Sequence, residues 1–164
     1  MGRNCLVLFI CFCLFSFEAV AKKGKYNDVS KNVYHIDVLD VVDGDTLFVE
    51  IYYTNTLSEK INIRLIGIDT PEKGGNARCD DEKVLAREAT KFMKGILLSA
   101  EKQGKKFFIN GVKKDKYGNR IDANVYFSDG EFLGNDVVNV AGEMLKTDLA
   151  VSYNGGRKLK NWCD

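Results

Sequence analysis

Asp45 is an acidic residue where the sequence pattern calls for an apolar side chain. In the segment 41–51 it shares its parity with Leu47 and Val49, and successive side chains of a strand point to opposite faces. A carboxylate on a buried face is costly unless it is paired with a positive charge or binds a cation. Asp45 therefore predicts a cationic partner close by, either a basic side chain or a metal ion.

A second group of charged residues offers that partner. Arg64 lies inside the apolar stretch 60–68, and Asp69 and Thr70 follow that stretch directly. Carboxylates and a backbone carbonyl form an all-oxygen ligand set, which suits a hard cation such as calcium and not zinc or copper.

Each motif also has an ordinary structural explanation. Asp43-Gly44 between apolar segments is typical of a tight hairpin turn. Thr70-Pro71-Glu72 is typical of a helix start, with Thr as the cap, Pro at the first helical position and Glu favoured by the helix dipole. Neither explanation accounts for the gathering of acidic and basic side chains at the ends of predicted strands.

Three blocks taken together resemble the signature of the staphylococcal nuclease (thermonuclease) family. They are Asp43-Gly44-Asp45-Thr46, then Arg64 with Asp69-Thr70-Pro71-Glu72, then Asp115-Lys116-Tyr117-Gly118 followed by Arg120. Their order and spacing agree with the family, and the resemblance covers roughly residues 33–153. The joint pattern is far more specific than any single block.

The resemblance implies a metal site and a catalytic base. It implies that Asp45, Asp69 and the carbonyl of Thr70 hold one Ca²⁺, which would polarise a phosphate oxygen. Glu72 would reach the attacking water, either to take its proton or to orient it. Asp43 would orient neighbouring groups or only form the turn.

The resemblance also implies that two arginines stabilise the negative charge on the phosphoryl oxygens. Arg64 is the first of them. In the family the second arginine usually follows the glycine of the third block directly, whereas here Asn119 intervenes between Gly118 and Arg120. Counting forward from Gly118 gives Asn119, and counting back from the strand residue Val125 gives Arg120. We expect Arg120, because a turn absorbs a one-residue insertion easily.

Three residues are predicted to contact the substrate: Lys116, Tyr117 and Tyr153. Tyr117 would bind a terminal phosphate or serve only as an aromatic residue of the turn. Tyr153 is a candidate for the family's aromatic nucleotide contact, although the best-known member continues with a longer helix in this region. His35, the single histidine, is expected to be an ordinary strand residue, which disfavours histidine-based mechanisms.

Residues 1–21 have the pattern of a secretory signal peptide. An apolar run is followed by small residues at 19 and 21, so we expect cleavage after Ala21. The run is too short for a comfortable membrane span. Cys11 and Cys13 allow a lipoprotein alternative, which the bulky residues before them disfavour. We expect a secreted or periplasmic protein with no stable membrane association after cleavage.

Cleavage would leave Cys79 and Cys163 as the cysteines of the mature chain. An even pair in an oxidising compartment favours one disulfide, and the alternative is two separate thiols. The bond would close a loop of roughly 85 residues and stabilise the fold by about 4 kcal/mol in the chain-entropy model. It would also anchor the C-terminus, with Trp162 packed against the domain.

The formal net charge of +1 gives no global basic footprint of a nucleic-acid-binding protein. Basic residues gather locally at Lys102, Lys105, Lys106, Lys113, Lys114, Lys116 and Arg120. This basic run is either a solvated loop or a rim that attracts phosphate.

The pattern of elements predicts one domain over 33–164, after a flexible segment at 22–32. Strands are predicted at 33–42, 45–53, 60–68, 106–110 and 121–127, with a loop at 54–59. Helices are predicted at 79–100 and 133–141, the second with Asn135 as its cap and Gly142 as its stop. This order fits an α+β protein that is mainly a β-barrel: a five-stranded OB-fold barrel with about three packed helices, which the resemblance also implies.

The sequence therefore predicts a secreted, monomeric, calcium-dependent nuclease that hydrolyses DNA and RNA with little sequence specificity; the resemblance implies 3′-phosphate ends. The alternative is a non-catalytic OB-fold that binds single-stranded nucleic acid by stacking and a basic groove. A pure binder has no need of an acidic site that repels phosphate, so Asp45, Asp69 and Glu72 argue against it. A secreted structural or adhesion module would leave these residues unexplained.

Overall fold

The structure is a computed structural model that describes residues 32–116, 118–130, 132 and 136–163. The predicted signal peptide, all but the last residue of the predicted flexible segment, Tyr117 and Asn135 lie outside these residues. The strands are β1 (Tyr34–Val41), β2 (Thr46–Thr54), β3 (Leu57–Leu65), β4 (Gly67–Asp69), β5 (Lys106–Lys114), β6 (Arg120–Ser128), β7 (Val138–Asn139) and β8 (Val151–Tyr153). The helices are the 3₁₀ turn η1 (Gly74–Asn76), α1 (Asp80–Lys102) and α2 (Val140–Met144).

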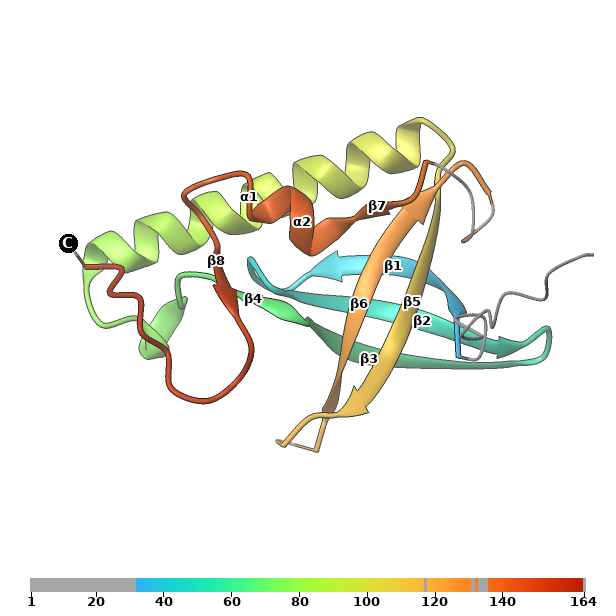
Figure 1. Cartoon of the computed structure of the whole chain (residues 1–164), viewed down its shortest axis with the longest axis horizontal. Helices are drawn as coiled ribbons and strands as arrows, with labels where there is room; N and C mark the ends of the chain where they lie inside the picture. The colour runs from blue at the N-terminus through green and yellow to red at the C-terminus, as the bar shows by residue number, and fades with distance from the viewer. Residues whose placement is uncertain (1–31, 117, 131, 133–135, 164) are drawn as a thin grey trace, which may run out of the picture.

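Five strands close into an OB-fold barrel. Neighbouring strands in the order β3-β2-β1-β5-β6 are antiparallel, and a parallel pairing of β3 with β6 completes the ring. In Figure 1 the β5–β6 hairpin crosses the β1–β2–β3 meander, and α1 and α2 lie together along one side. The predicted fold class is therefore confirmed.

The core lies between the barrel and α1. Alternate residues of β2 point inward, so Leu47, Val49 and Ile51 are at most 1% exposed. Ala89 and Met93 cover the open end of the barrel from one face of α1, and both are fully buried. This packing fixes the position of α1. The N-terminal turn of α1 can therefore hold the neighbouring loop of the candidate site in place.

The predicted segment boundaries needed several corrections. A two-residue turn at Asn55-Thr56 replaces the predicted loop 54–59, so β3 begins at Leu57. Residues 70–72 lie in irregular backbone and start no helix. The described residues contain two α-helices and the single turn η1 where about three helices were expected.

The second predicted helix is also displaced. Residues 138–139 are extended as β7, because they pair with β6, and α2 starts only at Val140. Asn139 caps this helix, since its Oδ1 accepts a hydrogen bond from the backbone N–H of Gly142 at 3.1 Å. Gly142 therefore lies inside α2 and does not end it.

A small second sheet brings the C-terminal part of the chain to the site. β8 pairs antiparallel with β4, which places Val151 opposite Asp69 and Tyr153 opposite Gly67. After β8 the chain returns to the N-terminal end of α1 (Figure 1), where a disulfide joins Cys163 to Cys79 with a Cα–Cα distance of 5.9 Å. We call residues 154–163 the C-terminal strap.

Candidate active site

Arg64 joins two buried carboxylates at one end of the barrel. Its Nη1 lies 2.7 Å from Asp45 Oδ1, and its Nη2 lies 3.4 Å from Asp69 Oδ1. Asp45 and Asp69 are 4% and 2% exposed. Asp45 thus has the cationic partner that its position among apolar residues predicts, and it is buried like Leu47 and Val49.

Strand pairing and a close approach of the backbone position this group. Thr46, the first residue of β2, lies opposite Arg64 of β3. The preceding turn packs against α1: a Cβ on Gly44 would lie 2.8 Å from both Ala89 Cβ and Thr70 Oγ1. The glycine is therefore required by packing as well as by the hairpin turn that the sequence predicts.

The site contains more buried negative charge than its arginine neutralises. Burial raises the pKa of Asp45 to about 7, although the Arg64 guanidinium and the Thr46 hydroxyl favour the ionised carboxylate. Burial lowers the pKa of Arg64, but the charges of Asp45 and Asp69 outweigh this effect and raise the pKa above its ordinary value. A second cation reduces the cost of the buried charge, and Lys158, described below, also favours the ionised form of Asp45.

A buried glutamate fixes the loop that carries Glu72. Glu82 lies in the first turn of α1 and is 2% exposed. Its Oε1 accepts a hydrogen bond from the backbone N–H of Glu72 at 3.2 Å, and its Oε2 accepts one from that of Arg78 at 2.7 Å. Cys79 caps the same turn, because its Sγ accepts from the N–H of Glu82 at 3.3 Å. The arrangement is a capping box whose glutamate reaches past the cap to the preceding loop.

A lysine of the C-terminal strap enters the site from the other side. The Nζ of Lys158 lies 2.6 Å from Asp69 Oδ1 and also contacts Glu72 Oε1. Burial lowers the pKa of Lys158, but the bonds to Asp69 and Glu72 outweigh it and raise the pKa. Lys158 is therefore a positive charge placed between a predicted metal ligand and the predicted base.

Arg120 begins β6 at the mouth of the site. Its Nε lies 3.0 Å from Oδ2 of Asp115, which is 5% exposed. Asp122 lies opposite Arg64 in the β3–β6 pairing, and burial, together with the neighbouring Asp115, raises its pKa. Both Arg120 and Asn119 line the cavity described next, so the position of the second arginine stays a prediction.

One open cavity of about 710 Å³ collects most of the predicted residues. Its lining includes Asp45, Arg64, Thr70, Glu72, Lys116, Arg120 and Tyr153. Asp69 lines an adjoining cavity of about 350 Å³ together with Glu72 and Lys158, and the last two residues line both. The ring of Tyr153 lies 5.9 Å from the Arg64 guanidinium, so an aromatic face and a cation stand together in the cavity wall.

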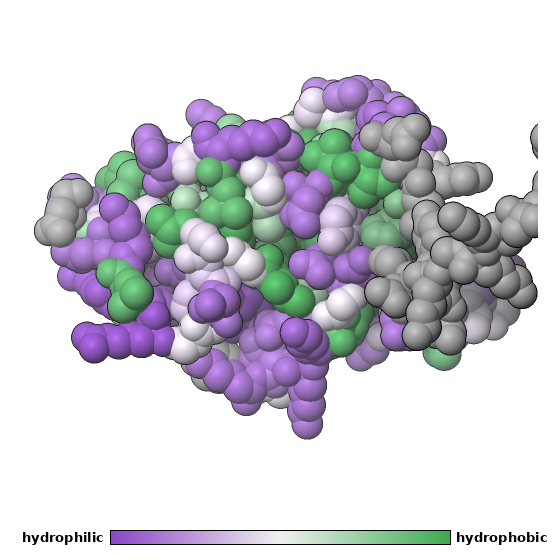
Figure 2. All heavy atoms as spheres, viewed as in Figure 1, coloured by the Kyte–Doolittle hydropathy of each residue, from purple (hydrophilic) through white to green (hydrophobic). Residues whose placement is uncertain are grey.

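The basic run divides between two places. Lys114 and Lys116 line the site cavity, whereas Lys105 and Lys106 line a different one. Figure 2 shows hydrophilic side chains along the lower edge of the molecule, where Figure 1 places the tip of the β5–β6 hairpin. Only the part of the run near this tip is placed to attract phosphate to the site.

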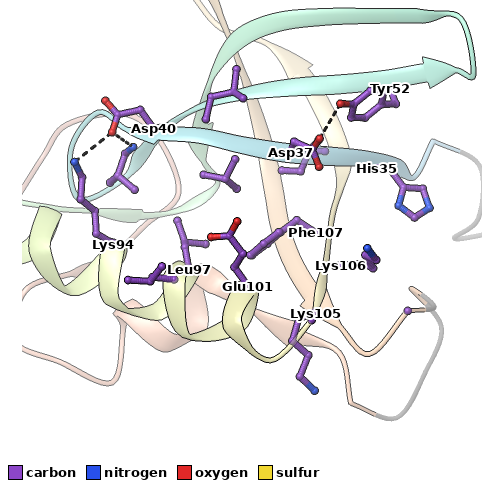
Figure 3. Close-up of a pocket in the computed structure, with 17 residues that line it drawn as sticks. His35, Asp37, Asp40, Tyr52, Lys94, Leu97, Glu101, Lys105, Lys106 and Phe107 are labelled. Carbon is purple, nitrogen blue, oxygen red and sulfur yellow. Dashed lines mark hydrogen bonds and ion pairs between the residues drawn. The ribbon is translucent and has the colours of Figure 1, made fainter.

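The other cavity is larger, about 970 Å³, and lies between β1 and the C-terminal half of α1 (Figure 3). Both of its aspartates have partners in the lining: Asp40 pairs with Lys94 at 3.2 Å, and Asp37 accepts a hydrogen bond from the hydroxyl of Tyr52 at 2.7 Å. His35 is exposed at its edge, on strand β1 as predicted. No pair of buried carboxylates lies in this cavity among the described residues, so the smaller one is the candidate active site.

The family model described as staphylococcal nuclease homologue matches residues 62–161. The chain belongs to this family. A relative is the uncharacterized protein MJ1439 of Methanocaldococcus jannaschii, which is 30% identical over 176 residues, covering 93% of this chain and 80% of the relative. The matched range includes Arg64, Asp69 and Glu72 but not Asp45, which the structure places against Arg64. In the described part of the chain, no helix is long and apolar enough to cross a membrane.

A metal ion in this staphylococcal nuclease homologue would bind to oxygen. Within the described ranges, no three His, Cys, Asp or Glu side chains are grouped so that they alone would hold a metal ion. Two carboxylates and a carbonyl, completed by water, need only two such side chains. Asp45, Asp69 and Thr70 supply these oxygen types, and the two carboxylates lie close enough together to contact the same guanidinium.

Two residues of the site were missed at the level of sequence. Lys158 belongs to no sequence motif, because a lysine in a polar segment has no distinguishing local signal. Glu82 is one of three acidic residues in the first turn of α1, a pattern common at helix starts. The spacing from Cys79 to Glu82 is that of a cap and its third helical position, which could have indicated the capping role.

Proposed function

We propose that this staphylococcal nuclease homologue is a secreted, calcium-dependent nuclease that hydrolyses phosphodiester bonds of DNA and RNA and leaves 3′-phosphate ends. The observation that carries the proposal is the bridge from Arg64 to both Asp45 and Asp69, beside Glu72 in an open cavity. A fixed guanidinium next to paired carboxylates suits a phosphoryl group that gains negative charge during reaction.

Asp45, Asp69 and the carbonyl of Thr70 are the residues that would hold calcium. When bound, the ion supplies polarisation of a phosphoryl oxygen. The chain's own part is to keep both carboxylates buried: the β2–β3 pairing and the packing of Gly44 against α1 position Asp45, and the β4–β8 pairing positions Asp69. Neither carboxylate then needs to rearrange before the metal binds.

Glu72 is the proposed base, which either takes a proton from the attacking water or orients that water. Its backbone is fixed by Glu82, so its carboxylate stays near Asp69. Arg64 and Arg120 would bind the phosphoryl oxygens, and Arg120 keeps its orientation through Asp115. Lys116 and Tyr153 line the same cavity and would contact the nucleotides on either side of the cleaved bond.

Secretion is supported by the signal-like pattern of residues 1–21 and by the disulfide between Cys79 and Cys163. Disulfides form and persist in oxidising compartments and are rare in the cytosol. Secreted and periplasmic locations both satisfy these observations.

The test is incubation of the mature protein with single-stranded DNA and RNA, in calcium, in zinc and in excess chelator. We expect cleavage in calcium only, and products that accept a 3′-end label only after phosphatase treatment. Glu72→Gln should abolish cleavage, while Glu59→Gln, an exposed carboxylate on β3, should retain it. Full cleavage in chelator would refute the metal, and binding without cleavage in calcium would favour an OB-fold that only binds nucleic acid.

A further inference from the structure

We propose that Lys158 is a built-in cation that competes with calcium for the site and so sets the calcium concentration at which the protein is loaded. The inference rests on the proposed calcium-dependent function. It concerns the affinity for the ion, whereas the proposed function concerns what the loaded site does.

The contacts place the ammonium where a metal ion would make its bonds. The Nζ of Lys158 lies 2.6 Å from Oδ1 of Asp69, a proposed calcium ligand, and it also contacts Oε1 of Glu72. Arg64 reaches the same Asp69 oxygen at 3.4 Å, so Lys158 is the nearer of the two cations to that carboxylate. In the absence of metal, the lysine neutralises charge that calcium would otherwise neutralise.

The C-terminal strap fixes Lys158 at both ends. On one side, β8 pairs with β4, the strand that ends at Asp69. On the other side, Trp162 is 5% exposed, and Cys163 is bonded to Cys79 at the start of α1. Lys158 therefore lies on a segment that is fixed at both ends. This keeps its ammonium close to Asp69 and Glu72 at a smaller entropic cost than a free tail would have.

Coulomb repulsion gives the size of the effect. A unit charge and a divalent ion about 4 Å apart repel strongly enough, even at the dielectric constant of water, to weaken binding roughly 30-fold. The side chain of Lys158 is only 30% exposed, so water screens this repulsion incompletely. Calcium must displace the ammonium from Asp69 or bind against it, and both routes reduce the affinity.

The experiment measures calcium binding to the mature, disulfide-bonded protein by titration calorimetry, without any substrate. We expect Lys158→Met to bind calcium roughly 30-fold more tightly than the unsubstituted protein. The control is Arg157→Met, which removes one positive charge from the adjacent, exposed position of the strap and should change the affinity less than twofold. Calcium should also raise the melting temperature more in Lys158→Met than in either other protein.

A second variant acts through the tether. Cys79→Ser with Cys163→Ser puts a hydroxyl oxygen in place of the sulfur at the cap of α1 but releases the end of the strap, so it should also tighten calcium binding. Equal or weaker binding in Lys158→Met, with calcium still bound, would overturn the competition and leave the proposed function intact. Absence of calcium binding in every protein would overturn the proposed metal and the competition together.

Discussion

Replacing Glu82 by Gln tests whether the first turn of α1 positions the proposed base. Glu82 accepts hydrogen bonds from the N–H groups of Glu72 and Arg78 through its two carboxylate oxygens. A glutamine keeps one acceptor, so one N–H group would face an amide NH₂. Loss of one bond to a charged, buried acceptor costs about 1.5–3 kcal/mol, and loss of the negative charge at a helix N-terminus adds about 0.3–1 kcal/mol.

The expected total is about 2–4 kcal/mol in the free energy of unfolding, or roughly 5–15 °C in melting temperature. Because the loop that carries Glu72 would lose its anchor, kcat should fall about tenfold or more with little change in KM. Thermal denaturation in chelator and steady-state kinetics in saturating calcium would measure the two effects separately.

The matched control is Asp81→Asn, one position earlier in the same turn. Asp81 is exposed, so its replacement removes a charge from the helix N-terminus and should cost only about 0.3–1 kcal/mol. The reasoning is wrong if Glu82→Gln is no less stable than Asp81→Asn, or if it retains full kcat. The loop would then be fixed by other contacts.

Three further predictions concern the rest of the site. Arg64→Lys and Arg120→Lys should each lower kcat by about 10²–10³ with a smaller effect on KM, since a lysine cannot hold two phosphoryl oxygens in one plane; a change within about threefold would indicate a structural ion pair. Because the folded-state pKa of Asp45 is raised to about 7, its contribution to the stability of the metal-free protein should be present at acid pH and lost as the pH rises through 7. Calcium affinity should correspondingly weaken as the pH falls below 7, which titrations between pH 5 and pH 8 would reveal. Reduction of the bond between Cys79 and Cys163, which closes a separation of 84 residues, should lower the melting temperature, and thiol reagents should label both sulfurs only after reduction.

Local pattern was enough to find the two buried carboxylates and the arginine between them. Asp45 stands out because strand parity is strict and a carboxylate on the apolar parity needs a cation. Arg64 and Asp69 stand out because they interrupt or follow an apolar strand. The barrel could also be predicted, since five strands and one long helix in this order leave few compact arrangements.

Residues whose role depends on distant parts of the chain could not be predicted in this way. Lys158 reaches Glu72 across 86 positions, and no local pattern marks it. Gly44 fits a hairpin turn so well that its contact with α1 and Thr70 adds no signal to the sequence. In the described part of the predicted helix at 133–141, residues 138–139 form a strand instead, because their pairing with β6 outweighs the helical tendency of that segment.

The N-terminal turn of α1 connects the two less regular parts of the site. Glu82 binds the loop that carries Glu72, and Cys79, three residues earlier, both caps the turn and bonds the strap that carries Lys158. Strand pairing fixes the metal ligands, since Asp45 directly precedes β2 of the barrel and Asp69 ends β4, which pairs with β8. The base and the competing lysine instead each depend on this single turn. A disturbance there should therefore alter catalysis and calcium affinity together, while one confined to the barrel's far end should alter neither.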